Sequence, residues 1–379
     1  MIYFDNGATT PLLSEVKDKM INILENFGNP SSLYGIGRES KQLVEDSMQT
    51  IADFMKCPVE NLFITSGASE SNSWVIYSAF RKAREKHKGN HIVCSMIEHH
   101  SIKNALEDLH KSQGVDITYV GTDKYGIVSP KDVEAAMRND TFLVIVMTAN
   151  NETGTIQPIG RIAEVAHKYG ALIFTDATQY FGKGNIEFLV NDVNYLSASA
   201  HKLHGPKGIG LLYVSDPILL YPLVHGTQQG AKRGGTENVL EIVGFAEAVR
   251  QASLHMYEWN NHVQKLTMHL LNRILDEISG TKLNGHRLMR LCGTLNISFE
   301  GIRGEELLML LDLNGVCVST GSACNSASNE PSYVLLALGC TPEEANSSIR
   351  FSLSHFNTME EVDYVVDKLK ELISQLRGK

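Results

Sequence analysis

The sequence predicts an α/β protein with a mostly parallel central sheet between helices, followed by a smaller α+β unit. From residue 60 to about 214, short runs rich in β-branched residues alternate with stretches of helical spacing, as in α/β folds. Several runs are apolar at nearly every position, as at residues 142–147, which is typical of strands buried on both faces of a sheet. The chain has 379 residues, and single cores stop growing at roughly 250 to 300 residues, so we expect two domains.

The larger unit should contain alternating strands and helices. The expected strands are residues 61–65, 91–95, 116–120, 142–148, 171–175, 195–199 and 208–214. The expected helices are residues 69–88, 101–111, 130–138 and 159–168, and the last two begin near a proline, which the first turn of a helix tolerates. Ligands of such sheets bind beyond the carboxyl ends of the strands.

The pattern changes after Gly234 and Gly235, where a long helical stretch from about residue 239 to 279 should lead into a second domain. That domain should be an α+β unit with strands at 294–300, 316–319 and 348–353 and helices at 304–313 and 359–376. We therefore predict a large domain at residues 15–255. The small domain would combine residues 1–14 with 256–379 and carry a cysteine loop at about 319–330.

Composition narrows the function classes. The net charge is −9 and the basic residues are scattered, which argues against direct nucleic-acid binding and favours small polar substrates or protein partners. The six cysteines show no Cys-x-x-Cys spacing, so reduced thiols in a cytoplasm are expected rather than disulfides or a zinc ribbon. No signal-peptide pattern opens the chain, and no apolar run approaches the ~20 residues that span a bilayer.

One cysteine stands apart from the rest. Free cysteines usually lie in the core, as expected here for Cys94 and Cys317. Cys324 instead lies among glycine, serine and alanine at residues 319–328, with no large apolar neighbour. We predict a reactive thiol on a soft loop, because small residues give loops low local stability.

Lys202 is the candidate for covalent chemistry with a carbonyl group. It follows an expected strand and is flanked by serine, histidine and a glycine-proline turn. Partial desolvation favours the neutral amine that forms Schiff bases. Lys207 is the rival, although its position on a tight turn is also that of an ordinary loop lysine.

Residues 65–70 join a strand end to a helix start, and they are small or carry hydroxyl groups. Helix N-termini bind phosphate, although a plain serine N-cap would look similar. Thr236 could supply a further phosphate donor. The glycines at 35 and 37 lack the rest of a dinucleotide fingerprint, and no Walker A pattern exists, so nicotinamide and ATP are disfavoured.

Asp176 ends an apolar strand and could pair with a protonated pyridine nitrogen, although lone aspartates there are often helix caps. Together with Lys202 after a neighbouring strand, it indicates pyridoxal phosphate. In the 98–100 segment, one imidazole could stack on a cofactor ring or relay protons. The histidine pairs 99/100 and 201/204 also allow a metal, which is disfavoured because no third ligand has a recognisable spacing.

These motifs, taken together, resemble the cysteine desulfurases of the NifS/IscS type, within the class V aminotransferases. The resemblance spans nearly the whole chain and rests on residues 4–10, 28–32, 65–72, 98–100, 150–152, 176–179, 199–202, 233–236, 319–328 and 350–352. It implies a fold-type I, pyridoxal-phosphate-dependent homodimer with active sites near the subunit interface.

The resemblance also implies roles by position. Lys202 would hold the cofactor as a Schiff base, and His99 would stack on the ring and help with proton transfer. Asp176 would pair with the ring nitrogen, and Gln179 would bind the ring hydroxyl. The implied phosphate ligands are Ala68, Ser69, Ser199 and His201, with Thr236 from the partner subunit. Asn151 and Arg350 would hold the carboxylate of L-cysteine.

In the implied reaction, Lys202 removes the α-proton of L-cysteine, Cys324 attacks the substrate sulfur as a thiolate, and alanine leaves while Cys324 keeps a persulfide. A sulfur-acceptor protein would follow, for iron–sulfur cluster assembly, tRNA thiolation or another thio-cofactor. The alternatives are selenocysteine lyase, another fold-type I enzyme such as a transaminase, and an inactive scaffold. A transaminase needs no mobile thiol, and Lys202, Asp176 and Cys324 are all present.

Overall fold

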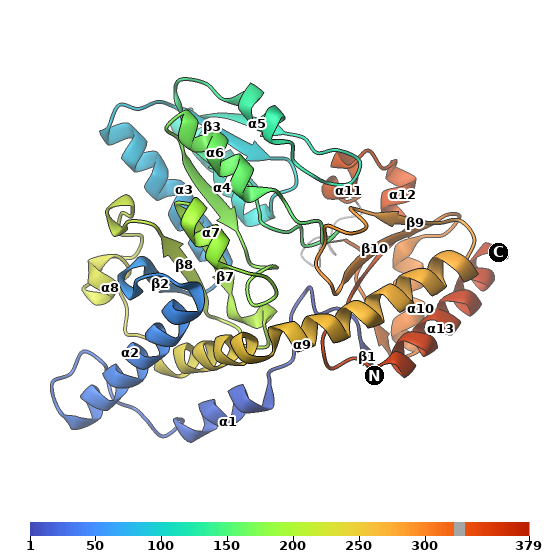
Figure 1. Cartoon of the computed structure of the whole chain (residues 1–379), viewed down its shortest axis with the longest axis horizontal. Helices are drawn as coiled ribbons and strands as arrows, with labels where there is room; N and C mark the ends of the chain where they lie inside the picture. Colours follow the sequence, from blue (N-terminus) through green and yellow to red (C-terminus); the bar gives the residue numbers. More distant parts are fainter. Residues whose placement is uncertain (322–329, 379) are drawn as a thin grey trace.

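The computed structural model describes residues 1–321 and 330–378. A seven-stranded sheet lies at its centre, with helices on both faces (Figure 1). The strand order is β2-β8-β7-β6-β5-β3-β4, and all pairs are parallel except those that β8 makes with β2 and β7. The strands are β2 (Leu62–Thr65), β3 (His91–Ser95), β4 (Asp116–Val120), β5 (Thr141–Ile145), β6 (Leu172–Asp176), β7 (Tyr195–Ser199) and β8 (Gly210–Val214). The predicted, mostly parallel α/β sheet is confirmed.

Both faces of this sheet are buried, as the apolar strands predicted. Along β5, Leu143 and Ile145 join one hydrophobic core and Val144 joins the other. The helices of this part are α1 (Ser14–Asn22), α2 (Gly35–Met55), α3 (Ala68–Glu85), α4 (His100–Gln113), α5 (Pro130–Ala136), α6 (Ile159–Lys168), α7 (Glu187–Asp192) and α8 (Gln228–Ala231).

Helix α9 (Val239–Glu277) connects the sheet to the second part of the molecule (Figure 1). Its first half packs Ile242 and Phe245 into a core of the sheet, and its second half packs Leu266 and Leu270 into a separate core. The predicted helix at 239–279 is therefore confirmed to within two residues at its end.

The second part is built on an antiparallel three-stranded sheet in the order β12-β10-β9. Its core also takes Phe4 from the N-terminal segment, where β1 pairs in parallel with β11. The elements are β1 (Ile2–Tyr3), β9 (Thr281–Asn284), β10 (Thr294–Phe299), α10 (Gly304–Leu313), β11 (Val316–Cys317), α11 (Tyr333–Ala337), α12 (Pro342–Asn346), β12 (Ser348–Ser352) and α13 (Met359–Arg377). The domain boundaries given above stay a prediction.

Some elements differ from the sequence predictions. The long helix α2 was missed, because it opens with glycines at 35 and 37 and its N-cap Tyr34 offers no side-chain bond. Gly37 is required there by close packing, since a Cβ atom would lie 2.6 Å from the Ser32 carbonyl oxygen. The expectation that Cys317 lies in the core was wrong: it is only partly buried, at the end of the two-residue strand β11.

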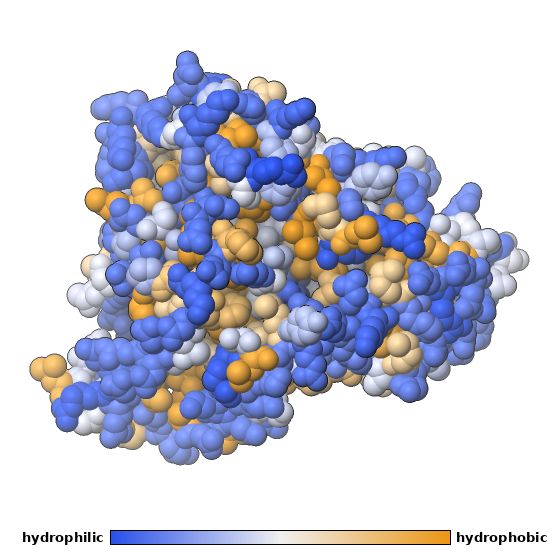
Figure 2. Space-filling model, viewed as in Figure 1, coloured by the Kyte–Doolittle hydropathy of each residue, from blue (hydrophilic) through white to orange (hydrophobic). Residues whose placement is uncertain are grey.

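The described surface carries no sign of a membrane span. No helix within residues 1–321 and 330–378 is long and apolar enough to cross a bilayer. The face shown in Figure 2 is largely hydrophilic, with its hydrophobic residues in small separate groups.

Candidate active site

A cavity of about 540 Å³ lies beyond the carboxyl ends of β6 and β7. The N-terminal segment at Gly7 and strand β12 complete its wall. Of the predicted site residues that the structure describes, it brings together all but Thr236, namely Ala68, Ser69, His99, Asn151, Asp176, Gln179, Ser199, His201, Lys202 and Arg350. Its size is within the range of roughly 300 to 1,000 Å³ that is usual for small-molecule sites.

Lys202 lies in a short 3-10 helix, Ala200–Lys202, directly after β7. Its amine donates hydrogen bonds to the backbone carbonyls of Gly7 and Ala8, both at 2.6 Å. Lys207 lines the same cavity. The structure therefore leaves both lysines as candidates by position, while Lys202 is the one at the strand end.

Asp176 is the last residue of β6, directly beside β7 through its pairing with Ser197. One carboxylate oxygen accepts from Asn72 Nδ2 at 3.0 Å and the other accepts from the Thr178 backbone N–H at 2.9 Å. The carboxylate is thus held at the sheet edge in a fixed orientation. This is the placement that a partner for a ring N–H requires.

His99 is the N-cap of α4. Its Nδ1 accepts from the Ser101 backbone N–H at 3.2 Å and lies 2.9 Å from Ser101 Oγ. Burial lowers the pKa of its imidazole, an effect that the nearby Asp176 carboxylate opposes. His99 is therefore mainly neutral near pH 7, and its ring is held by the turn that starts the helix.

The first turn of α3 forms the anion-binding end of the cavity. Helix α3 begins at Ala68 after Gly67, and Gly67 supplies no side-chain cap, so the first backbone N–H groups are not used by a cap. Ser69, Ser199 and His201 line the same cavity. Helix N-termini with exposed N–H groups attract anions such as phosphate.

Arg350 and Asn151 form the opposite, carboxylate-binding end. Arg350 Nη2 pairs with Asp5 Oδ1 at 2.7 Å, and Nη1 donates to the Asn151 carbonyl oxygen at 3.1 Å. Arg350 Nε and Asn151 Oδ1 are buried and have no hydrogen-bond partner among the described residues. Buried polar atoms without a partner are uncommon, and here they belong to residues that line one cavity.

Gln179 lines the cavity, and Glu98, the residue before His99, is fully buried. Gln179 Nε2 donates to the Gly7 carbonyl oxygen at 3.0 Å, so its amide is already bonded to the N-terminal segment. Burial raises the pKa of Glu98 to about 8, although hydrogen bonds from Ser95 Oγ and the Met147 N–H lower it. Glu98 is thus mostly protonated at neutral pH.

One predicted residue lies in another cavity, and one is not among the described residues. Thr236 lines a neighbouring cavity, which shares Ser66 and Gly208 with the first. Cys324 falls in residues 322–329, outside the described residues.

The two histidines of the 201/204 pair do not converge on one point. His201 lines the candidate active site, whereas His204 lines a different cavity, where its Nδ1 lies 2.9 Å from the Pro11 carbonyl oxygen. No group of three metal-ligating side chains occurs in the described part of the chain.

Asn72 and Gly7 are parts of the site to which sequence reasoning assigned no role. Asn72 lies one turn into α3, on the helix face that meets Asp176, and helical spacing from residue 68 could have indicated it. Gly7 acts through its backbone carbonyl, which carries no sequence signal.

Comparison with known proteins identifies the family of this chain. The aminotransferase class-V family model matches residues 2–365. The chain belongs to this family. It is 43% identical to the cysteine desulfurase IscS of Methanosarcina thermophila over 379 residues, covering 100% of this chain and 93% of the relative.

Two solved structures extend the match from the sequence to the fold. A NifS-like protein superposes with a TM-score of 0.91 at 34% identity, over 99% of both chains. The structure of SspA in complex with cysteine superposes with a TM-score of 0.81 at 35% identity, over 94% of this chain and 100% of that one. Pyridoxal phosphate is the cofactor of these enzymes, and the resemblance to cysteine desulfurases is confirmed at the level of family and fold.

Proposed function

We propose that the chain is a pyridoxal-phosphate-dependent cysteine desulfurase, which converts L-cysteine to L-alanine and leaves the sulfur as a persulfide on Cys324. The observation that carries the proposal is the convergence of Lys202, Asp176 and Arg350 in one cavity, from the ends of the neighbouring strands β6 and β7 and from strand β12. The similarity to cysteine desulfurases and to a cysteine-bound structure supports the choice of substrate.

The residues present fit pyridoxal phosphate. The cavity offers an amine for the aldehyde carbon, a fixed carboxylate for the ring nitrogen, and the open first turn of α3 for the phosphate. Asn72 Oδ1 and Thr178 Oγ1 are further buried atoms of this cavity with no partner among the described residues. When bound, the cofactor supplies a pyridinium ring that accepts the electron pair released at the substrate α-carbon.

Each protein group then has one task. Arg350 and Asn151 bind the carboxylate of L-cysteine, for which the planar guanidinium is suited. The Lys202 amine accepts the α-proton, and its two bonds to the Gly7 and Ala8 carbonyls place it at the strand end. Asp176 keeps a proton on the ring nitrogen, and neutral His99 is available to accept a proton near the substrate sulfur.

Cys324 receives the sulfur in this proposal. Its thiolate attacks the sulfur of the bound substrate, the carbon–sulfur bond breaks, and a sulfur–sulfur bond forms. L-cysteine and one thiol thus become L-alanine and one persulfide, so atoms and electrons balance without an oxidant. The thiolate is the required nucleophile.

The assembly and location are also proposed. Thr236 lines a neighbouring cavity of its own chain and not the candidate active site. In a homodimer, Thr236 of a second copy would supply the phosphate contact instead. The strongly exposed Leu24, Phe27 and Leu33 offer apolar surface for such contacts. We further propose a cytoplasmic enzyme that hands sulfur to an acceptor protein, either an iron–sulfur scaffold or a tRNA sulfurtransferase.

The decisive experiment replaces Cys324 by alanine in the holoenzyme and measures alanine formation from L-cysteine, together with the transfer of ³⁵S from labelled L-cysteine to the protein. The variant should keep the cofactor and bind cysteine, but alanine formation should fall by at least about 100-fold, because the nucleophile is lost. Cys57→Ala, at a partly buried cysteine, is the matched control and should keep activity. Wild-type-like turnover by Cys324→Ala would disprove the persulfide step.

A further inference from the structure

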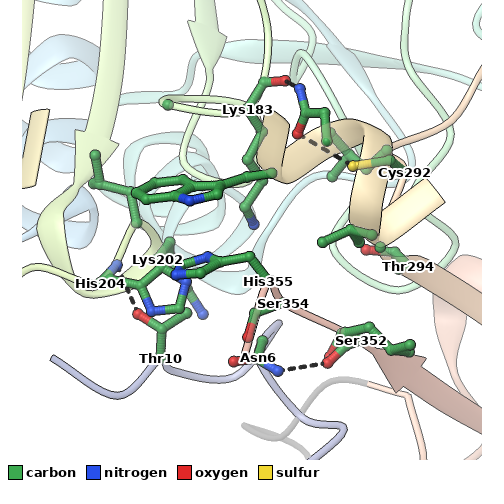
Figure 3. A pocket seen from close by; sticks show the side chains of 18 of the residues that line it. Asn6, Thr10, Lys183, Lys202, His204, Cys292, Thr294, Ser352, Ser354 and His355 are labelled. Atoms are coloured by element: carbon green, nitrogen blue, oxygen red, sulfur yellow. Dashed lines mark hydrogen bonds between the residues drawn. The ribbon is translucent and has the colours of Figure 1, made fainter. Parts of the chain in front are cut away.

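A second cavity lies next to the candidate active site (Figure 3). Lys202 and Gly7 line both cavities. Lys183, His204, Cys292 and His355 are among the remaining lining residues, and the volume is about 60 Å³. This is room for only a few water-sized species.

The Lys183 side chain extends into this cavity (Figure 3). Its amine makes no hydrogen bond or ion pair with any part of the chain that the structure describes. Burial lowers the pKa of the amine to about 8, so a large share still carries a positive charge near pH 7. Charges inside proteins are normally paired, since an unpaired one is costly to desolvate.

Among the described residues, no carboxylate lines the cavity to neutralise this charge. The residues that line the cavity include no aspartate or glutamate, and residues 322–329 contain none either. Cys292 also lines the cavity, but burial raises the pKa of its thiol, so the thiol stays protonated. That thiol donates to Asn260 Oδ1 at 3.3 Å, and Asn260 Nδ2 donates to the Lys183 carbonyl oxygen at 2.8 Å.

Three of the residues that line the cavity, Trp259, His204 and His355, form a packed group of rings. The rings of Trp259 and His355 stack, with centroids 4.1 Å apart and planes within 5° of each other. The centroid of the His204 ring lies 4.8 Å from that of His355. Burial lowers the pKa of both histidines, so the rings stay neutral near pH 7. The cavity therefore holds the Lys183 amine, beside a wall that it shares with Lys202, in a small space lined by neutral rings.

We propose that this cavity binds a small inorganic monoanion, such as a halide, beside the Lys183 amine. The positive charge of the Lys183 amine favours an anion, and a cavity of about 60 Å³ is too small for an anion as large as L-cysteine. The site stands independently of the proposed desulfurase activity. Because Lys202 also lines the cavity, a bound anion would favour the charged form of that lysine as well.

The test uses bromide with the full-length holoenzyme. Crystals soaked in sodium bromide should show an anomalous peak beside Lys183 Nζ, and bromide NMR lines in solution should broaden with a saturable dependence on enzyme. Both signals should disappear in Lys183→Met, which keeps the side-chain length but removes the charge. Lys265→Met, at an exposed lysine of α9, is the matched control and should keep both signals.

Three results would overturn the anion site: only water beside Lys183, a peak in the crystal with no saturable broadening in solution, or equal broadening in Lys183→Met. If that variant fails to fold, Lys183→Gln takes its place with the same expectation. Cysteine turnover is measured separately, so failure of the bromide test leaves the proposed activity standing, and failure of turnover leaves the anion site standing.

Discussion

The Lys202 amine donates a hydrogen bond of 2.6 Å to the backbone carbonyl of Gly7, which lies 195 residues earlier in the chain. The same carbonyl accepts from Gln179 Nε2 at 3.0 Å, and the Gly7 N–H donates to Ser352 Oγ at 2.7 Å. One glycine therefore joins the edge of the large sheet to strand β12. The N-terminal segment thus contacts both Lys202, through Gly7, and Arg350, through Asp5, and holds these two parts of the site together.

Replacing Lys202 by alanine should abolish the cofactor adduct that borohydride traps, because only a primary amine forms the reducible bond. Lys207→Ala is the matched control, since Lys207 lines the same cavity and should leave the adduct intact. Mass spectrometry of the reduced protein locates the modified peptide. An adduct that persists in Lys202→Ala and is lost in Lys207→Ala would move the Schiff base to the other lysine.

The sequence predicts those parts of the site that sit at the ends of regular elements. Asp176 ends an apolar strand and Lys202 follows a neighbouring one, and parallel neighbouring strands place their carboxyl ends at one edge. The Gly7 contacts were not predictable, because a backbone carbonyl has no sequence pattern and its partners are far away in the chain. Lys183 was missed for a similar reason: nothing in its local sequence marks a lysine without a partner.

Arg350→Lys should raise KM for L-cysteine by roughly 10- to 100-fold, which corresponds to the ~1.5–3 kcal/mol of a hydrogen bond to a charged group. Lysine keeps the charge but loses the planar fork that fits a carboxylate. The comparison substrate is cysteamine, which lacks the carboxylate and should lose nothing.

Asp5→Asn separates this role from a structural one, since Arg350 also pairs with Asp5. If Asp5→Asn raises KM as much as Arg350→Lys, or if cysteamine turnover falls equally, the arginine acts by holding the N-terminal segment and not by binding substrate.

His204 should make the free energy of unfolding depend on pH. Burial lowers its pKa to about 3, with a further lowering by His355 and an opposing hydrogen bond to the Pro11 carbonyl. In the unfolded chain a histidine titrates near pH 6.5. Between these two values the unfolded chain binds a proton that the folded chain does not, so the free energy of unfolding falls as the pH is lowered from about 6.5 towards 3.

His204→Asn should therefore reduce the slope of the free energy of unfolding against pH by up to about 1.4 kcal/mol per pH unit near pH 5, the value for one proton. Urea unfolding of the holoenzyme between pH 4.5 and 6.5 gives this slope. His87→Asn is the matched control, because His87 is exposed and both histidines have a positive φ, 48° for His87 and 65° for His204, which asparagine tolerates. Equal slopes in the wild type and His204→Asn would show that His204 takes up its proton in the folded protein.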